Sequence, residues 1–255
     1  MIKIRHLKKT FDGVHYITND LSLDIPTGQM TCIIGRSGEG KSVLLKQILG
    51  LIKPTSGHIY IDDVDITALD AKGMQDIFKK CGYVFQFAAL LDSLTVLENI
   101  GLSLLEQGMS LEAIQPIVEE KLTQVNLIPR DVLHKYPSEL SGGMRKRVGL
   151  ARTLMSNPST ILYDEPTTGL DPLTARVVHE LMYSKQKQLQ ITSVVVSHDV
   201  EIFKYVDNIA LLYQGSIKFF GDAATIWESD NPYVYQFIRG LSEGPIQVET
   251  TREYK

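Results

Sequence analysis

The chain has 255 residues, of which 44% are hydrophobic, and this length allows one or two domains with a sizeable core. A formal net charge of −4 argues weakly against bulk binding to nucleic acid, and we expect no nucleic-acid partner. Basic residues near the start precede no apolar stretch, and no run approaches the roughly 18 apolar residues of a membrane span, so we expect the chain itself to be soluble. Cys32 and Cys81 lack metal-ligand spacing, which favours reduced thiols in a cytosolic protein.

The N-terminal residues predict two strands of an antiparallel layer. Apolar and polar side chains alternate over residues 2–8 and again over residues 21–25, with a break at Asp12-Gly13 between them. Phe11 lies just before that break. Its ring can stack on adenine at the edge of a nucleotide pocket, or it can close the strand by ordinary packing, and both interpretations stay open.

Residues 30–50 predict a strand, a glycine-rich loop and a helix that stops at Gly50. The loop and the start of the helix run Gly35, Arg36, Ser37, Gly38, Glu39, Gly40, Lys41, Ser42 and Val43. Glycines let backbone N–H groups face a polyphosphate, and a helix that opens at Lys41 directs its positive end at the same anion. In this pattern Lys41 contacts the β- and γ-phosphates and Ser42 binds Mg²⁺. A flexible glycine-rich turn is the alternative, and the flanking strand and helix argue against it.

Two further strands are predicted over residues 58–61 and 82–85, and Gln86 then opens a stretch of helical periodicity at about 87–158. An amphipathic helix is expected there over residues 111–122. The residues directly after Gln86 are too apolar for a solvated loop: Phe87, Ala88, Leu90, Leu91 and Leu94. They form either a groove that holds a helix of a membrane partner or part of the core of the helical insertion.

Ser141, followed by Gly142 and Gly143, can cap a helix whose first turns are basic. This predicts a second helix terminus that attracts anions. The alternative is an ordinary capped helix with a solvated basic face at residues 145–147.

Residues 160–163 predict a buried strand that ends in Asp164 and Glu165. The ligand crevice of an open α/β sheet lies outside the carboxyl ends of its strands, so Asp164 can reach Mg²⁺ while Glu165 faces an attacking water. Asp171 is expected to cap a helix with Pro172 as its first residue. A strand over residues 191–196 delivers His198 to the same edge, although a lone histidine is more often a satisfied surface or core residue.

Taken in order, these motifs resemble those of an ABC transporter ATPase subunit over nearly the whole chain. The resemblance rests on Phe11, the phosphate loop, Gln86, residues 140–143, Asp164-Glu165, Asp171 and His198. It implies an α/β fold of the P-loop NTPase class, with a mixed-sheet core, an N-terminal antiparallel layer and a helical insertion. We expect one ATPase domain over residues 1–255, with a core at about 1–86 and 159–220, a helical subdomain at about 87–158, and a C-terminal helix and tail at about 221–255.

The same resemblance implies ATP and Mg²⁺ as ligands and assigns roles to single residues. Phe11 would be the adenine platform, and residues 35–43 would hold the phosphates. Ser42, Gln86 and Asp164 would bind Mg²⁺, and Gln86 would also be a catalytic residue that senses the attacking water. Glu165 would be the general base, and His198 would align the γ-phosphate and the attacking water. In that family two subunits pair head to tail, so Ser141, Gly142 and Gly143 would complete the partner's ATP site, and Asp171 would couple the two sites.

Four segments outside these shared motifs resemble the corresponding segments of the Mla/Mce group of lipid-transport ATPases. They are residues 87–96, which follow Gln86, residues 144–147, which follow the signature residues Ser141, Gly142 and Gly143, residues 194–200, and residues 236–245. This resemblance implies a peripheral ATPase on the cytoplasmic face of an inner membrane, bound to a permease and to a lipid-binding MCE-type protein, that powers phospholipid transport. No residue indicates the direction of transport.

Two other classes share part of this pattern. An ATPase of an amino-acid or other small-solute importer would carry the same catalytic motifs and differ after Gln86 and after the signature. A soluble ABC protein of translation or DNA repair usually has two cassettes or a long coiled-coil insertion, whereas this chain has one cassette and no sustained heptads.

Overall fold

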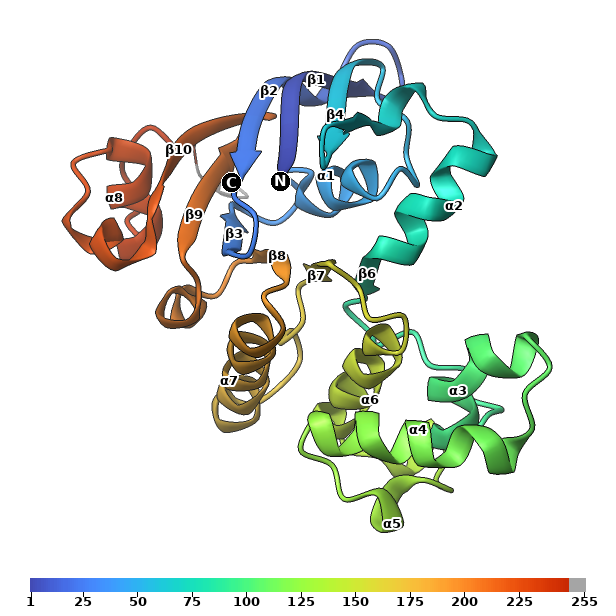
Figure 1. Ribbon diagram of the computed structural model, residues 1–255. Helices are drawn as coiled ribbons and strands as arrows, with labels where there is room; N and C mark the ends of the chain where they lie inside the picture. Colours follow the sequence, from blue (N-terminus) through green and yellow to red (C-terminus); the bar gives the residue numbers. More distant parts are fainter. Residues whose placement is uncertain (248–255) are drawn as a thin grey trace, which may run out of the picture.

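The computed structural model describes residues 1–247, and the last residues of the predicted C-terminal tail, 248–255, lie outside the described part. A six-stranded sheet in the order β10-β9-β3-β8-β7-β6 forms the centre of the molecule (Figure 1). Its strands are β3 (Met30–Ile34), β6 (Cys81–Val84), β7 (Thr160–Asp164), β8 (Thr192–Ser197), β9 (Asn208–Tyr213) and β10 (Ser216–Asp222). Neighbours pair in parallel, except that the edge strand β10 pairs antiparallel with β9. The expected mixed-sheet core is confirmed.

Strands β3, β7 and β8 are buried along their whole length, because other elements cover both faces of the sheet. Burial on both faces explains why their sequences are close to unbroken apolar runs. The predicted positions of β3, β6, β7 and β8 are right to within one residue. Phe85 falls outside β6, and Ser197 lies inside β8.

A four-stranded antiparallel sheet in the order β2-β1-β4-β5 lies over one face of the central sheet (Figure 1). It consists of β1 (Ile2–Thr10), β2 (Tyr16–Ile25), β4 (Ser56–Ile61) and β5 (Val64–Asp65). Strands β1, β2 and β4 are longer than predicted. Ile2, Ile4 and Leu7 of β1 are buried, as their alternation with basic residues predicts. This confirms the expected N-terminal antiparallel layer.

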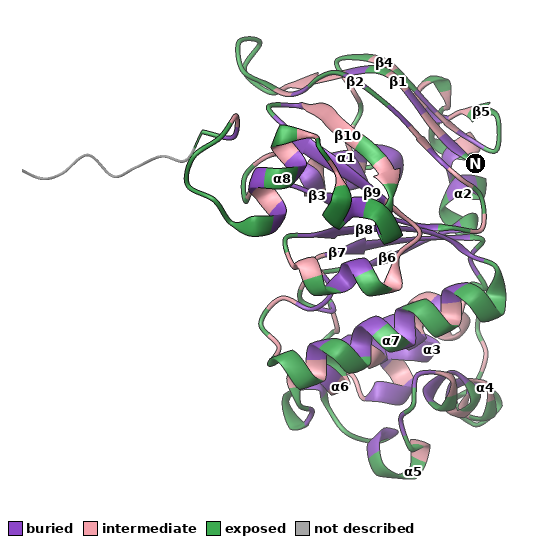
Figure 2. Ribbon diagram, turned by 90° about the vertical axis from the view of Figure 1, so that its left-hand side faces the viewer, coloured by how far each residue is buried: buried purple, intermediate pink, exposed green. Residues whose placement is uncertain are grey.

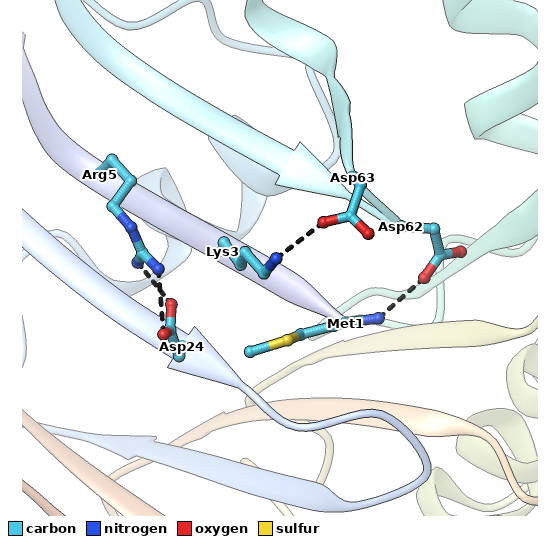
Figure 3. Close-up of polar contacts among 6 residues, drawn as sticks. All are labelled: Met1, Lys3, Arg5, Asp24, Asp62 and Asp63. Atoms are coloured by element: carbon cyan, nitrogen blue, oxygen red, sulfur yellow. Dashed lines mark hydrogen bonds and ion pairs between the residues drawn. The ribbon is translucent and has the colours of Figure 1, made fainter.

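Ion pairs fasten the central strand of this layer to its neighbours, as Figure 3 shows. They join the amino group of Met1 to Asp62 at 2.8 Å, Lys3 to Asp63 at 2.7 Å, and Arg5 to Asp24. Pairs as exposed as these contribute only about 0–1 kcal/mol each. The layer is therefore stabilised mainly by the apolar side chains on its inner face.

The helices are α1 (Lys41–Ile48), α2 (Ala71–Lys80), α3 (Val96–Glu106), α4 (Leu111–Gln124), α5 (Pro129–Val132), α6 (Gly142–Leu154), α7 (Pro172–Leu189) and α8 (Pro232–Arg239). Short 3₁₀ turns occur at Ile66–Ala68, Pro137–Glu139, Val200–Tyr205 and Ala223–Glu228. Helices α3 to α6 form the expected helical insertion and lie away from the antiparallel layer in Figures 1 and 2. Within residues 1–247, no helix has the length and apolar character needed to cross a bilayer.

Two apolar cores lie on opposite faces of the central sheet. Ile33 and Val194 join the core under the antiparallel layer, together with α1. The alternate residues Cys32 and Val195 join the other core, with α6 and α7. Figure 2 shows α7 with its buried side toward the sheet. The carboxyl ends of the parallel strands therefore lie along one edge of the central sheet, between the two packed layers.

Both cysteines are buried free thiols, as predicted. Burial raises the pKa of both, and that of Cys81 to about 12, so neither is a reactive thiolate near neutral pH.

Candidate functional site

The phosphate loop connects β3 to α1 and bends where glycine is required. Gly38 and Gly40 have φ angles of +85° and +88°, and a Cβ on Gly40 would collide with Ile17 of β2. Gly40 is the N-cap of α1, which begins at Lys41 as predicted. Exposed Ser37 and the half-buried Ser42 and Val43 complete the loop and the first turn.

Lys41 is only 4% exposed, and its Nζ donates to the carbonyls of Gly35 and Arg36, each at 2.9 Å. Burial lowers the pKa of Lys41, and the carboxylates of Glu165, Glu39 and Asp164 oppose that shift. An ammonium held inside the turn of the loop is placed to meet an anion that enters there.

The other side chains of the loop are tied to distant segments. The Glu39 carboxylate accepts from the main-chain N–H of Gln214 at 2.7 Å. Arg36 donates to the carbonyl of Gln247, so the end of the described chain lies against the phosphate loop.

Ser42 of α1 and Asp164 of β7 are in contact where the parallel strands of the central sheet end. Ser42 Oγ donates to Asp164 Oδ1 at 2.7 Å, and the hydroxyl of Tyr83 donates to Asp164 Oδ2 at 2.9 Å. Burial, followed by the nearby Asp164 charge, raises the pKa of Tyr83 and keeps this hydroxyl a donor. A hydroxyl and a carboxylate beside a phosphate loop are the hard oxygen donors that suit Mg²⁺, which prefers one or two carboxylates plus phosphate oxygens and water. Among residues 1–247 there is no group of three or more His, Cys, Asp or Glu side chains arranged for a metal.

Glu165 lies beside two other predicted site residues, Gln86 and His198. Its carboxylate accepts from Thr168 Oγ1 at 3.0 Å and from Gln86 Nε2 at 3.4 Å, and lies 3.4 Å from His198 Nδ1. Glu165 adopts a φ of +45°, which is uncommon for a residue with a side chain. Its N–H donates to Val196 of β8 at 3.0 Å, and this bond helps to hold the turn.

His198 follows β8 and also lines an open cavity of about 820 Å³. The loop after Glu165, the first turns of α7 and the 3₁₀ turn after β8 form the other walls of this cavity. The Leu173 side chain on its rim is 79% exposed. Charged side chains, among them Arg176, Glu201 and Lys204, also line the cavity.

Phe11 is 64% exposed, and Lys9 Nζ lies 4.7 Å from the centre of its ring. The ring is therefore not buried in a core, and the Lys9 ammonium lies over it. The exposed ring stays available for stacking, in a turn where the carboxylate of Asp12 accepts from the N–H groups of Val14 and His15.

Helix α6, which follows the signature residue Ser141, begins as predicted. Ser141 is its exposed N-cap, and Ser141 Oγ accepts from the N–H of Met144 at 3.3 Å. Gly142 and Gly143 form the first turn, and Gly143 lies against Thr174 of α7. Asp171 caps α7 by accepting from the N–H groups of Leu173 and Thr174, at 3.1 and 3.0 Å.

The basic residues after the signature glycines differ in exposure: Arg145 is exposed, Arg147 is half-buried and Lys146 is buried. The alternative interpretation of a solvated basic face therefore fails for Lys146 and holds for Arg145. Arg145 donates to the carbonyl of Leu140 at 2.8 Å, and Arg147 donates to the carbonyl of Asn126 at 2.8 Å. Lys146 is 8% exposed and donates to the carbonyl of Gln86. These cations hold main-chain segments of their own subunit.

The apolar segment after Gln86 divides between the two predicted roles. Phe87 and Leu91 are 84% and 47% exposed, whereas Ala88 is 3% exposed and Leu90 packs against the helical core. Leu94 is half-buried. The expectation of one continuous apolar groove is therefore wrong for Ala88 and Leu90, because the loop turns alternate side chains inward.

Sequence reasoning missed several residues that organise the site. Tyr83 and Thr168 position the two carboxylates, and Thr168 could have been found from its position three residues after Glu165 in the same turn. Buried Asn99 holds the apolar segment, because its Nδ2 donates to the carbonyls of Leu91 at 3.0 Å and Leu94 at 2.9 Å. Tyr83 and Lys146 act through contacts between distant segments, which no local pattern marks. Asn99 contacts residues that lie shortly before it in the chain.

The fold and this site define a class of protein, the ABC-type ATPase. The sequence profile of the ABC transporter family matches residues 18–168, and the chain belongs to this family. It is an ATP-binding, ATP-hydrolysing subunit of that type.

Particular relatives are similar over most of the chain. A probable ribonucleotide transport ATP-binding protein, Mkl of Mycobacterium leprae, is 39% identical over 99% of this chain and 72% of its own length. The methionine import ATP-binding protein MetN of Carboxydothermus hydrogenoformans is 39% identical over 85% of this chain and 65% of its own length. The dimeric structure of the bacterial ABC transporter cassette MJ0796 superposes with a TM-score of 0.80 at 35% identity, covering 88% of this chain and 99% of the cassette. The same cassette, in a post-hydrolysis state bound to ADP and Pi, gives a TM-score of 0.78.

Proposed function

We propose that ATP binds and is hydrolysed at the edge where β3, β7 and β8 end, and that this reaction powers transport through a membrane permease. The observation that carries the proposal is the convergence of Lys41, Ser42, Asp164, Glu165 and Gln86 at that edge. Lys41 and the N–H groups of the phosphate loop hold the phosphates, and the exposed Phe11 ring stacks on the base.

Ser42, Asp164 and Gln86 would hold Mg²⁺, which when bound neutralises phosphate charge. The protein's own groups supply the remaining chemistry. Glu165 accepts a proton from the attacking water, and hydrogen bonds from Gln86 and Thr168 fix the orientation of its carboxylate. His198 lies beside that carboxylate and aligns the water with the γ-phosphate. Phosphoryl transfer needs mainly positioning and charge stabilisation, which side chains held at the ends of buried strands provide.

We further propose that two copies pair head to tail, so that Ser141, Gly142 and Gly143 of one copy contact the γ-phosphate held by the other. Ser141 is exposed at a capped helix terminus, and the open cavity beside His198, with Leu173 on its rim, supports a face that receives a second copy. Asp171, at the start of α7 beside that rim, would couple the two sites.

Mixing variants tests this arrangement. Lys41→Ala and Ser141→Arg each damage both sites of a dimer made of one variant alone. A mixed dimer has one doubly damaged and one intact site, so mixing should restore part of the ATP-dependent dimer formation and turnover. Full activity of Ser141→Arg by itself would refute the head-to-tail arrangement.

The permease is proposed to contact Phe87 and Leu91, because these apolar side chains are exposed directly after Gln86. A nucleotide-dependent shift of Gln86 would alter this contact and so carry the ATP state to the permease.

The double change Phe87→Ser and Leu91→Ser should abolish copurification of the permease while ATP binding and thermal stability persist. Leu189→Ser is the matched control, since Leu189 is also 47% exposed but lies at the end of α7. Unchanged association of the double variant would contradict this docking site.

The cargo is proposed to be phospholipid, moved at the inner membrane with this subunit on its cytoplasmic face and with an MCE-type lipid-binding protein as a further partner. The support is the resemblance of residues 87–96 and 144–147 to lipid-transport ATPases. Methionine or another small solute is the second candidate, because the MetN relative is 39% identical over 220 residues.

Purification in mild detergent distinguishes the cargoes. The complex that carries Glu165→Gln should retain phospholipid above the level found with Lys41→Ala, measured by mass spectrometry of extracted lipid. L-methionine should leave the ATPase rate of the native complex unchanged. Equal lipid in both preparations, together with a methionine-dependent rate, would favour the importer.

The domain division proposed here remains a core at about 1–86 and 159–220, a helical subdomain at about 87–158, and a C-terminal part from about 221. Limited proteolysis should release fragments that end near these boundaries.

A further inference from the structure

Lys146 is a buried cation with a specific partner. It lies on α6 among apolar and aromatic side chains that include Val84 and Tyr163, and it is 8% exposed. Its Nζ donates to the main-chain carbonyl of Gln86. A buried ammonium is costly unless it is hydrogen-bonded, so this bond restrains both the lysine and the peptide unit that accepts from it.

The same residue, Gln86, reaches the proposed general base with its side chain. Gln86 Nε2 donates to Glu165 Oε2 at 3.4 Å. A peptide plane that is fixed at its carbonyl leaves the side chain few directions in which to point. Lys146 therefore acts on the orientation of Gln86 toward Glu165 through the main chain of the loop.

The next residues of the loop are held in the same way. Ala88 and Ala89 have φ angles of +59° and +48°, which are unfavourable for alanine. Arg152 of α6 donates to the carbonyl of Ala89 at 2.8 Å and to that of Ala88 at 3.2 Å. A Cβ on Gly149 would lie 3.2 Å from Ala88 Cβ, so the helix and the loop are in close contact. Helix α6 thus imposes a strained loop conformation through main-chain carbonyls.

We propose that Lys146 is a positioning residue for ATP hydrolysis, which fixes the Gln86 peptide and so directs the Gln86 side chain to Glu165. The inference rests on the proposed roles of Gln86 and Glu165. Because Ser141 caps the N-terminus of α6, the contacts of Lys146 and Arg152 with the loop also couple the movement of Ser141 to that of the Gln86 loop. The proposal thereby names an intramolecular link between the two functional segments of one subunit.

A double-mutant cycle on the full chain, purified with its membrane partner, tests the proposal. Lys146→Met keeps the length and apolar stem of the side chain and removes its donor. It should lower kcat about tenfold and leave the KM for ATP within about twofold, since it disturbs positioning rather than binding. If Lys146 acts through Gln86, adding Lys146→Met to Gln86→Ala should lower kcat by less than about twofold further.

Lys121→Met is the matched control, because Lys121 is also 8% exposed and donates to Asn157 Oδ1 at 2.9 Å within the helical subdomain. It should change kcat by less than about twofold while showing what removal of a buried lysine does to the melting temperature. If Lys146→Met does not fold, Lys146→Leu, which also lacks a donor, enters the cycle in its place. Lys146→Gln, which keeps an N–H donor, should retain more activity than Lys146→Leu.

The outcomes separate this inference from the function on which it rests. Normal turnover of Gln86→Ala would remove the proposed role of Gln86, and the inference with it. A defective Gln86→Ala combined with a normal Lys146→Met would overturn the inference alone. A double variant whose loss equals the product of the two single losses would also overturn it, because the two residues would then act independently.

Discussion

Replacing Glu165 by glutamine separates the shape of the site from its chemistry. The glutamine side chain has the same length, and its remaining oxygen can accept from Thr168 Oγ1 at 3.0 Å and Gln86 Nε2 at 3.4 Å, as the carboxylate does. The turn itself is held by the main-chain bond from Glu165 to Val196, which the substitution leaves intact.

The expected magnitudes differ sharply between stability and rate. The pair with His198, at 3.4 Å, is the ion pair that the Glu165 carboxylate makes, and the His198 side chain is 57% exposed. The Glu165 charge also favours the charged form of Lys41. A pair this exposed contributes about 0–1 kcal/mol, so the substitution should change the free energy of unfolding by at most about 1 kcal/mol. Loss of the general base should slow hydrolysis by about 10²–10⁴, which corresponds to roughly 3–5 kcal/mol of barrier.

The assay measures phosphate release at saturating ATP, with ATP affinity and thermal unfolding measured on the same preparation. Bound ATP should then persist and hold two copies together in size-exclusion chromatography. Glu180→Gln is the control, since Glu180 pairs with Arg176 on the exposed face of α7. Near-normal turnover of the partner-bound Glu165→Gln variant would refute the assignment of Glu165 as the general base. A large loss of stability would show that the contacts of the carboxylate contribute more to folding than expected here.

Further predictions concern binding, stability and pH. Lys41→Ala should raise the Kd for ATP by about 10- to 100-fold, because it removes a charge-assisted contact that exists before the transition state; an unchanged Kd in a fluorescent-nucleotide titration would contradict this. Asn99→Ala should lower the free energy of unfolding by about 2–4 kcal/mol in urea, since buried main-chain groups lose their partners, and a change below about 1 kcal/mol would show that the loop finds other partners. The side chain and N–H of His15 hold the pKa of Asp12 well below its ordinary value of 3.8, so the stabilisation that Asp12 gives its turn is fully present above pH 3.8 and is lost as the pH falls through the lowered value. An NMR titration midpoint for the Asp12 carboxyl at or above 3.8 would count against that network.

The sequence alone was sufficient where the determining interactions are local. The bends at Gly38 and Gly40, the N-caps Ser141 and Asp171, and the alternation in β1 each involve residues a few positions apart. Glycine is needed where φ is positive, and a polar side chain is needed where a helix leaves its first N–H groups unpaired. These requirements act on neighbouring residues and can be predicted before any tertiary contact is known.

Tertiary structure decided which of the alternatives applied. Phe11 is exposed, Ala88 is buried, and Lys146 is buried against the carbonyl of Gln86 while its neighbour Arg145 is exposed. Each outcome depends on what a different segment brings to that place, and sequence spacing carries no information about such a neighbour.

The carboxylates show the division most clearly. Adjacency in the sequence placed Asp164 and Glu165 at the end of one strand. Only the fold separated their surroundings: Asp164 accepts from Ser42 and Tyr83, which come from α1 and β6, while Glu165 meets Gln86 and His198, which follow β6 and β8. The parallel order of these strands brings their carboxyl ends to one edge, and that geometry makes two neighbouring acids different in function.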